Sequence, residues 1–285
     1  MSSERSVALP SSRSAPIVLE PSHGWRSVDL AELWRYRELL FFFVWRDVKV
    51  RYKQTLLGVI WVLIRPILSV ILFTLIFGKL AKMPSDGLPY PVFVLAAMIP
   101  WNFFAGALAS GSNSVQSNAH LITKVYFPRI VIPTASVFSG FVDVVITFAL
   151  VIVLMLWYGI VPPVEAVITV PFLFLVTIVV ALGMSFWLGA LNVAYRDVGN
   201  AVPFLLQIWL YATPVVYPLS RVPEKWRWIV VLNPMTGVVE AFRGALFGRP
   251  WPAIPLALTC GLGLILLITG VFYFRRVENT FADTV

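Results

Sequence analysis

Six long apolar stretches divide the chain, and polar or proline-rich segments separate them. They cover residues 56–77, 91–110, 131–158, 166–194, 198–217 and 253–274. Each stretch has about 20 residues or more, the length that an α-helix needs to cross the hydrocarbon core of a bilayer. The pattern predicts an all-α membrane protein with six transmembrane helices, forming a single transmembrane domain over 29–285.

The chain before the first apolar stretch has two parts. Residues 1–28 are rich in Ser, Pro and Arg without apolar periodicity, which predicts a flexible tail. Residues 29–53 begin with Asp29 and Glu32, which resemble a capping box, and carry apolar residues at helical spacing: Leu30, Leu33, Trp34, Phe41, Val44, Trp45 and Val48. This predicts an amphipathic helix in the membrane interface. It is either a surface anchor alone or also a docking surface for a cytoplasmic partner.

A broken segment separates the fifth stretch from the sixth. It has an aromatic and basic part around Trp226 and Trp228, and then Asn233-Pro234 opens a short helical piece that carries Glu240 and Arg243 one turn apart. A hairpin between two spans needs no such piece. Irregular backbone at membrane depth is tolerated only against protein or a water-filled cavity. We therefore expect a re-entrant helical segment here, and a conduit beside it.

Two ionisable residues lie inside predicted spans. Arg65 precedes Pro66 in the first span, and an arginine at mid-depth costs at least ~2.5 kcal/mol. Its side chain either reaches the headgroups or lines a polar path. Asp143 in the third span is either a functional group or the acceptor of a structural hydrogen bond. In the second span Gly106, Ser110 and Ser114 recur at every fourth position, which predicts a close approach to another helix.

Residues 118–133 interrupt the apolar pattern between the second and third spans. The segment starts polar, carries Lys124 and Arg129, and stops at Phe127-Pro128. It is either a short helix at the cytoplasmic surface or an ordinary basic loop, since Lys and Arg gather on cytoplasmic flanks.

Composition supports the membrane assignment and excludes several classes. The chain of 285 residues is 59% hydrophobic and 13% charged, whereas a soluble domain has roughly 25% charged residues. The net charge of +8 fits cytoplasmic flanks near anionic lipid, so no nucleic-acid partner is expected. Cys260 is the single cysteine and the two histidines are far apart, so neither a disulfide nor a metal site is predicted. We also expect no cleavable signal peptide.

The distribution of basic residues predicts that both termini are cytoplasmic. Nine of the 22 Lys and Arg residues precede Leu56, and Arg275-Arg276 follow the last span. One segment opposes this assignment, because the region between the fifth and sixth spans is basic and would lie outside. Its residues are Arg221, Lys225, Arg227, Arg243 and Arg249. Partial burial of this region would weaken the objection.

The chain carries no recognisable catalytic constellation or nucleotide site. Its only Gly-Lys pair, Gly78-Lys79, is followed by Leu80, so there is no P-loop and no cofactor is expected within the chain. An ion-coupled carrier usually keeps several ionisable groups at mid-membrane, and here they are few. A transport subunit that is not itself an enzyme fits best. An ion-coupled carrier and a membrane-bound enzyme of glycan assembly remain competing hypotheses.

Aromatic side chains are abundant, at 14% of residues. Several lie within spans and are candidates to line a channel for a glycan: Trp61, Phe73, Phe77, Phe204 and Tyr211. Periodicity does not separate this role from lipid-facing or packing roles.

Five groups of residues, in this order, resemble one family. They are Leu57-Gly58 with Trp61 and Pro66; His120, Leu121, Ile122 and Lys124 up to Phe127-Pro128; Tyr195-Arg196-Asp197; Thr213-Pro214-Val215 with Tyr217-Pro218; and Asn233-Pro234 through Glu240 and Arg243. From about Leu39 onward, the chain resembles the transmembrane subunit of a type-2 ABC exporter, in the branch that exports O-antigen, capsular or teichoic-acid polysaccharides. A type-2 exporter of a drug or a lipid is the nearest alternative.

The resemblance implies partners, a location and roles. The chain would be half of a homodimer in the bacterial inner membrane, with two separate ATPase subunits that bind ATP and Mg. It would move a polysaccharide linked to a polyprenyl diphosphate out of the cytoplasm. The implied diphosphate contacts are Arg51, Lys53 and Arg65; the implied ATPase contacts are Trp34, Trp45, Asn118, His120, Lys124 and Phe127; and the implied extracellular gate includes Asn233, Pro234, Glu240 and Arg243.

Overall fold

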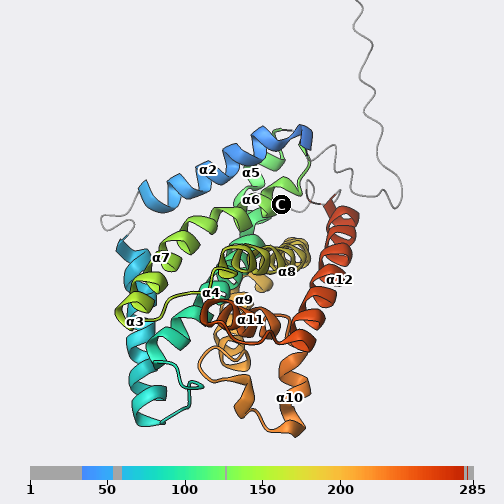
Figure 1. The fold of residues 1–285 in the computed structure, drawn as a ribbon. Helices are drawn as coiled ribbons and strands as arrows, with labels where there is room; N and C mark the ends of the chain where they lie inside the picture. Colours follow the sequence, from blue (N-terminus) through green and yellow to red (C-terminus); the bar gives the residue numbers. More distant parts are fainter. Residues whose placement is uncertain (1–33, 54–59, 126, 279–280, 282–285) are drawn as a thin grey trace, which may run out of the picture.

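The computed structural model describes residues 34–53, 60–125, 127–278 and 281, and throughout this part of the chain the secondary structure is helical (Figure 1). The predicted tail and the first residues of the predicted interfacial helix, 29–33, lie outside the described residues. Within these described residues, five helices are long and apolar enough to cross a membrane. They are α3 (Ile60–Phe73) continued by the π-helical η1 (Thr74–Leu80), α4 (Tyr90–Ser117), α6 (Val131–Ser139) continued by α7 (Phe141–Trp157), α8 (Ala166–Ala194) and α12 (Ala253–Val277). The predicted all-α membrane fold is confirmed.

The fifth predicted span is shorter than the sequence suggested. Helix α9 (Asp197–Ala212) has 16 residues, or about 24 Å at the usual rise per residue, against roughly 30 Å of hydrocarbon. It ends because Thr213 precedes Pro214, and a residue before proline is driven from helical to extended backbone. The chain then continues through a short non-helical stretch, residues 213–218, and the single helical turn η2 (Leu219–Arg221).

Two short helices occupy the predicted broken segment. Helices α10 (Glu224–Val231) and α11 (Thr236–Phe247) are bent by 95° relative to each other, as in a broken span or a re-entrant loop. Helix α10 is exposed at the end of the bundle, whereas most of α11 is buried. Gly248 ends α11 in a left-handed conformation (φ 63°), which glycine adopts without a steric cost.

Helix α4 forms the centre of the bundle. Its residues from Val92 to Trp101 are all buried, and it packs against α6, α7, α8, α9 and α11. A helix that is apolar on all sides is typical of a buried position. The predicted small-residue contact is confirmed in part. A side chain at Gly106 would meet nothing within 4 Å, but Ser110 Oγ donates to the Ser136 carbonyl oxygen of α6 at 3.4 Å, and Ser114 is buried. A further close approach is at Gly111, where a Cβ atom would lie 2.5 Å from Ser185 Oγ of α8.

Helices α8 and α12 make the most extensive contact in the described part of the chain, and glycines allow it. A Cβ atom at Gly183 would lie 2.5 Å from the backbone nitrogen of Leu267, and one at Gly270 would lie 2.4 Å from the carbonyl oxygen of Gly183. No real side chain is accommodated at these distances, so the two backbones are in direct contact.

Helix α2 (Arg37–Lys53) lies across one end of the bundle, close to α6, and the last turn of α12 reaches the same end (Figure 1). Helix α10 lies at the opposite end. The sequence predicted the presence of α2 but not the face that it buries. Phe43 is its one buried residue within the described range, and Tyr36, Leu39, Leu40 and Val44 pack beside it. The other face carries the exposed Phe41 and Trp45, and the exposed Trp34 lies just before the helix.

Candidate functional site

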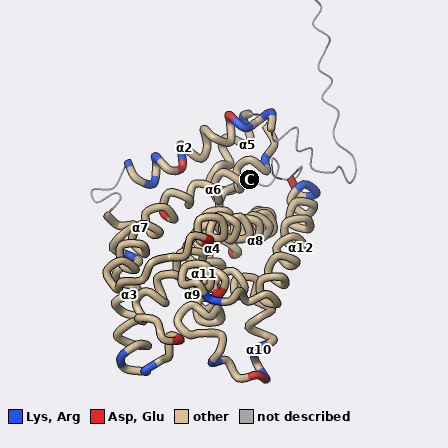
Figure 2. The backbone as a smooth tube through the Cα atoms, viewed as in Figure 1, with Lys and Arg blue, Asp and Glu red and all other residues tan. Residues whose placement is uncertain are grey.

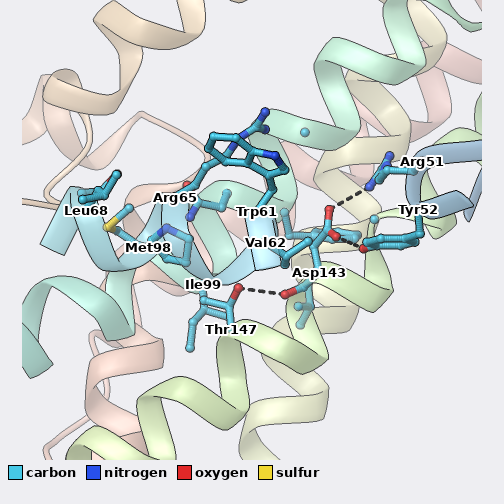
Figure 3. A pocket seen from close by; sticks show the side chains of 17 residues that line it. Arg51, Tyr52, Trp61, Val62, Arg65, Leu68, Met98, Ile99, Asp143 and Thr147 are labelled. Carbon is cyan, nitrogen blue, oxygen red and sulfur yellow. Dashed lines mark hydrogen bonds and ion pairs between the residues drawn. The ribbon is translucent and has the colours of Figure 1, made fainter. Parts of the chain in front are cut away.

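A cavity of about 860 Å³ opens between the end of α2 and helices α3, α4 and α7 (Figure 3). Its walls are mainly apolar, and its charged groups are Arg51, Arg65 and Asp143. The lining residues are Arg51, Tyr52, Trp61, Val62, Arg65, Pro66, Leu68, Ser69, Met98, Ile99, Asn102, Phe103, Gly106, Gly140, Asp143, Val144 and Thr147. A cavity with an apolar wall and two guanidinium groups has the chemistry to hold a phosphate group on an apolar chain.

The end of α2 is joined to α7 by a polar contact across this cavity. Arg51 Nη1 donates to Asp143 Oδ2 at 2.7 Å, and Arg51 Nη2 donates to Ser139 Oγ at 3.3 Å. The Tyr52 hydroxyl donates to Asp143 Oδ1. Burial, and then the hydrogen bond to the Asp143 carboxylate, raise the pKa of the Tyr52 hydroxyl well above its usual value, so Tyr52 stays a donor. Asp143 therefore accepts structural hydrogen bonds, as one of the two sequence hypotheses expected, and it also lines the cavity. Its functional role stays a prediction.

The three predicted diphosphate contacts lie in different surroundings. Arg51 and Arg65 line the same cavity, as does the predicted aromatic residue Trp61. Lys53 is exposed at the end of α2 and is not among the lining residues. Arg65 is exposed while the following Pro66 is buried against the bundle, so α3 presents the arginine toward the cavity rather than the core.

The other candidate channel aromatics divide into two groups. Phe73 is buried, at 7% exposure, and its ring lies 6.0 Å from that of the half-buried Phe77. Both rings belong to or pack against the apolar core that includes α4. In the single chain they therefore serve helix packing rather than the lining of a channel. Phe204 and Tyr211 are exposed on α9, 62% and 52% respectively. These two residues are available to face either lipid or a second subunit.

The predicted ATPase-contact residues gather at the end of the bundle covered by α2. Trp45 is exposed on α2 and Trp34 is exposed just before it, and His120 and Lys124 are exposed at the short helix α5 (Ala119–Ile122) or just after it. The helix predicted at this point is therefore a single turn. Asn118 ends α4, and its side-chain amide donates to the Ser114 carbonyl oxygen at 2.8 Å.

Phe127 differs from the other predicted contacts because it is buried. Its ring lies 5.6 Å from that of Phe43 in an edge-on contact, so it fastens α2 to the 118–130 segment. Phe281 belongs to the same apolar cluster, lies 5.2 Å from Phe274 of α12, and brings the C-terminal region to this end. Sequence reasoning missed Phe281, because an isolated aromatic residue in a short acidic tail carries no periodicity.

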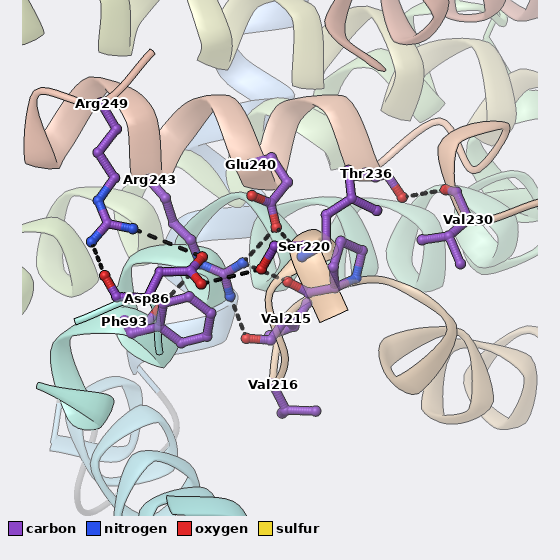
Figure 4. A network of polar contacts seen from close by, with 12 residues as sticks. Asp86, Phe93, Val215, Val216, Ser220, Val230, Thr236, Glu240, Arg243 and Arg249 are labelled. Atoms are coloured by element: carbon purple, nitrogen blue, oxygen red, sulfur yellow. Dashed lines mark hydrogen bonds and ion pairs between the residues drawn. The ribbon is translucent and has the colours of Figure 1, made fainter. Parts of the chain in front are cut away.

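A buried arginine organises the broken segment between α9 and α12 (Figure 4). Arg243 of α11 is 3% exposed and donates to the carbonyl oxygens of Phe93 (3.2 Å), Pro214 (2.7 Å) and Val215 (2.6 Å). It also donates to Glu240 Oε1 at 2.9 Å, and its guanidinium lies 3.6 Å from the centre of the Phe93 ring. One side chain thus joins α4, the 213–218 stretch and α11.

Glu240 and Asn233 complete this network. Glu240 Oε1 accepts from the backbone N–H of Leu219 at 3.2 Å. Asn233 Nδ2 donates to Thr213 Oγ1 at 2.8 Å, and Asn233 Oδ1 accepts from the backbone N–H of Met235 at 3.0 Å. The half-buried Pro234 lies between these groups, at the bend that separates α10 from α11. The four predicted gate residues therefore lie in one connected segment.

Three further residues, Asp86, Ser220 and Arg249, support the network from outside, and the sequence did not predict their contacts. Arg249 Nη2 donates to the Asp86 carbonyl oxygen at 2.5 Å, and its guanidinium lies 3.8 Å from the Asp86 carboxylate. Ser220 Oγ donates to Asp86 Oδ1 at 3.1 Å. Asp86 lies in the loop after the first span, more than a hundred residues before its partners, and one sequence gives no signal for such a pairing.

A second buried polar group explains the turn at Tyr195-Arg196-Asp197. Asn192, near the end of α8, is fully buried and donates through Nδ2 to the Ser112 carbonyl oxygen at 2.9 Å. Its Oδ1 accepts from the Gly199 N–H at 2.8 Å, in the first turn of α9. This residue fixes the tight reversal between α8 and α9 against α4.

Comparisons with known proteins agree with this architecture. Residues 38–247 match the family described as ABC-2 type transporter. The chain is 30% identical over 257 residues to the O-antigen export system permease protein RfbA of Myxococcus xanthus, covering 89% of this chain and 98% of the relative. It is 27% identical over 246 residues to a protein of the same name from Klebsiella pneumoniae, covering 86% and 94%. It is 22% identical over 242 residues to the polysialic acid transport protein KpsM of Escherichia coli, covering 82% and 91%.

Proposed function

Because the chain belongs to the ABC-2 type transporter family, we propose that it is the transmembrane subunit of an ATP-driven exporter of polysaccharide. The observation that carries this proposal is similarity over nearly the whole chain to permeases named for O-antigen export. A relative named for polysialic acid transport supports the same substrate class. The drug, lipid and ion-coupled alternatives have no comparable support.

The energy would come from a separate ATPase subunit. The chain has no P-loop, so ATP and Mg would bind on that partner. The surface that we assign to it includes Trp34, Trp45, His120 and Lys124, which are exposed at the end of the bundle covered by α2. Phe43 and Phe127 would transmit force from this surface, since they join α2 to the bundle.

The membrane orientation follows from the same assignment. The end covered by α2 would face the cytoplasm of a bacterial cell, with both termini on that side of the inner membrane. Basic residues lie at both ends of the bundle (Figure 2), so charge alone does not fix the orientation. The basic region between α9 and α12 would lie outside, against the usual cytoplasmic location of basic residues. This objection is weaker because Arg243 is buried and Arg249 forms an ion pair with Asp86.

The transport path requires a second copy of the chain. A homodimer would place the exposed face of α9, with Phe204 and Tyr211, toward a shared channel. The network around Arg243 would then hold the segment that closes the outer end. The phosphate groups of a lipid-linked polysaccharide would meet Arg51 and Arg65 at the inner end, with Lys53 nearby on α2.

Deletion of the gene tests this proposal in the source organism. We expect surface polysaccharide to be lost and full-length lipid-linked glycan to accumulate on the cytoplasmic side, because synthesis continues without export. Both pools are measured by lipid extraction and by surface labelling, with a strain that carries the gene on a plasmid as the control. Normal amounts of both pools, in a strain without a second exporter, would overturn the proposal.

A further inference from the structure

Helix α2 is attached to the bundle in two chemically different ways. In its middle, Phe43 enters an apolar cluster and is 5% exposed. At its end, Arg51 and Tyr52 bind Asp143 of α7. The side chains of Arg51 and Asp143 are 35% and 38% exposed, so water reaches this ion pair. Ion pairs with this exposure contribute little to stability, because solvent screens them and two long side chains lose freedom. The second attachment is therefore the weaker of the two.

The Arg51–Asp143 pair differs from the other ion pairs of the described residues. The Arg46–Asp47 pair joins neighbours on α2 and no second element. The Arg243–Glu240 pair is buried among carbonyl acceptors. The Arg249–Asp86 pair joins two loop segments, and neither residue lines the cavity. Only the pair at the end of α2 both joins two helices and opens into the 860 Å³ cavity.

The cavity suits a phosphate group that carries an apolar chain. Arg65 lines it together with Arg51, so two guanidinium groups and one carboxylate line the same cavity. Guanidinium groups bind phosphate oxygens through paired, charge-assisted hydrogen bonds. Trp61 and Met98 belong to the apolar wall beside them, on which a lipid chain can lie.

We propose that this cavity binds the diphosphate of a lipid-linked polysaccharide, and that the bound diphosphate takes both Arg51 and the Tyr52 hydroxyl from Asp143 and so releases the end of α2 from α7. The inference rests on the proposed function, and adds to it a device that reports substrate binding. Asp143 acts as the internal counter-ion that holds Arg51 while the cavity lacks a phosphate. Release leaves α2 attached through the apolar contacts around Phe43, and the exposed Trp45 of α2, with Trp34 just before the helix, would face the ATPase.

The test measures the distance between α2 and α7 in the complete transporter. Cysteines replace Lys49 of α2 and Val145 of α7, which are both exposed, in a background where Cys260 is changed to alanine. Spin labels are attached, and the complex with its ATPase subunits is placed in phosphatidylcholine nanodiscs. We expect undecaprenyl diphosphate to shift the distance distribution to longer values. An equal amount of phosphatidylglycerol is expected to leave it unchanged. An equal shift with phosphatidylglycerol would overturn the assignment to the lipid-linked substrate.

Variants test whether the Arg51–Asp143 ion pair acts as a latch, that is, whether it holds the end of α2 against α7 until lipid binds. They separate this role from a nonspecific weakening of the contact between α2 and the bundle. Asp143→Asn is expected to give the long-distance distribution without lipid and to tighten undecaprenyl diphosphate binding about two- to fivefold, since a competitor for Arg51 is removed. Arg51→Gln is expected to weaken that binding about tenfold. Asp47→Asn, which breaks a pair within α2, is the matched control and should match the wild type. The double variant Arg51→Asp with Asp143→Arg re-forms the ion pair with the charges exchanged. Without lipid, it should therefore show the short distance of the wild type rather than the long distance of Asp143→Asn.

An Asp143→Asn distribution identical to the wild type would overturn the latch. So would lipid binding that leaves the distance unchanged. In either case polysaccharide export by the wild-type strain would still stand, so failure of the latch is distinguishable from failure of the proposed function.

Discussion

Replacing Arg243 with alanine is expected to abolish export and to remove most of the folded protein from the membrane. The change leaves Glu240 in a largely buried site without its cation, and it leaves the carbonyl oxygens of Phe93, Pro214 and Val215 without the donor they share. Breaking a buried ion pair costs about 3–5 kcal/mol, and each orphaned acceptor adds about 1 kcal/mol or more. The sum approaches the whole stability of an ordinary domain, about 5–15 kcal/mol.

The measurement is the amount of monodisperse protein after detergent extraction, together with surface polysaccharide. Arg243→Lys should lie between the wild type and the alanine variant, because an ammonium group keeps the charge but does not reach four acceptors in the fork geometry of a guanidinium. Arg227→Ala is the matched control, since Arg227 is exposed and makes one long contact, 3.5 Å to the Val222 carbonyl oxygen. Wild-type amounts of folded and active Arg243→Ala protein would show that the network does not hold this segment.

Changing Gly183 to leucine is expected to have an effect of similar size for a different reason. Even a Cβ atom at this position would lie 2.5 Å from Leu267 N and 2.6 Å from the carbonyl carbon of Leu266, and both partners are backbone atoms. Helices α8 and α12 would have to separate, and overpacking costs typically about 1–3 kcal/mol, with more where backbone must move. We expect the thermal midpoint in detergent to fall by roughly 5 °C for alanine. For leucine, we expect little folded protein.

Gly261→Leu supplies the control on α12, because a Cβ atom there would meet nothing within 4 Å. Both variants add the same apolar side chain to a membrane helix, so only the local crowding differs. Equal yields and equal midpoints for the two variants would contradict the close contact of α8 with α12.

The sequence predicted the membrane helices well because their signal is strong and local. Five long apolar runs became long helices, since hydrophobicity over about 20 residues decides a span. The apolar run at 198–217 is helical only up to Ala212, because Pro214 and Pro218 do not allow the helix to continue. Here the prolines decide the end of the helix, although the apolar composition extends beyond it. The motif that joins Glu240 to Arg243 was visible because the two residues are one helical turn apart.

Other features depended on contacts that one sequence does not reveal. The spacing of apolar residues in α2 favoured the face with Trp34 and Trp45, but the bundle buries Phe43 because Phe127 and Ile122 offer a complementary surface there. The pairing of Arg51 with Asp143 joins residues 92 positions apart, and that of Arg249 with Asp86 spans 163 positions. The sequence shows that each of these four residues is charged. Which residue pairs with which depends on how the helices pack, and one sequence does not reveal that packing.

Translocation in a defined system tests the central claim most directly. The chain and its ATPase subunits would be reconstituted into sealed vesicles with a labelled polysaccharide linked to undecaprenyl diphosphate in the outer leaflet. With α2 facing outward, we predict that ATP moves the glycan into the lumen, where an added glycosidase no longer reaches it. Vesicles without the chain, or without ATP, should show no protection. Protection that follows an ion gradient without ATP, or no protection in a complex that hydrolyses ATP, would contradict the assignment as an ATP-driven polysaccharide exporter.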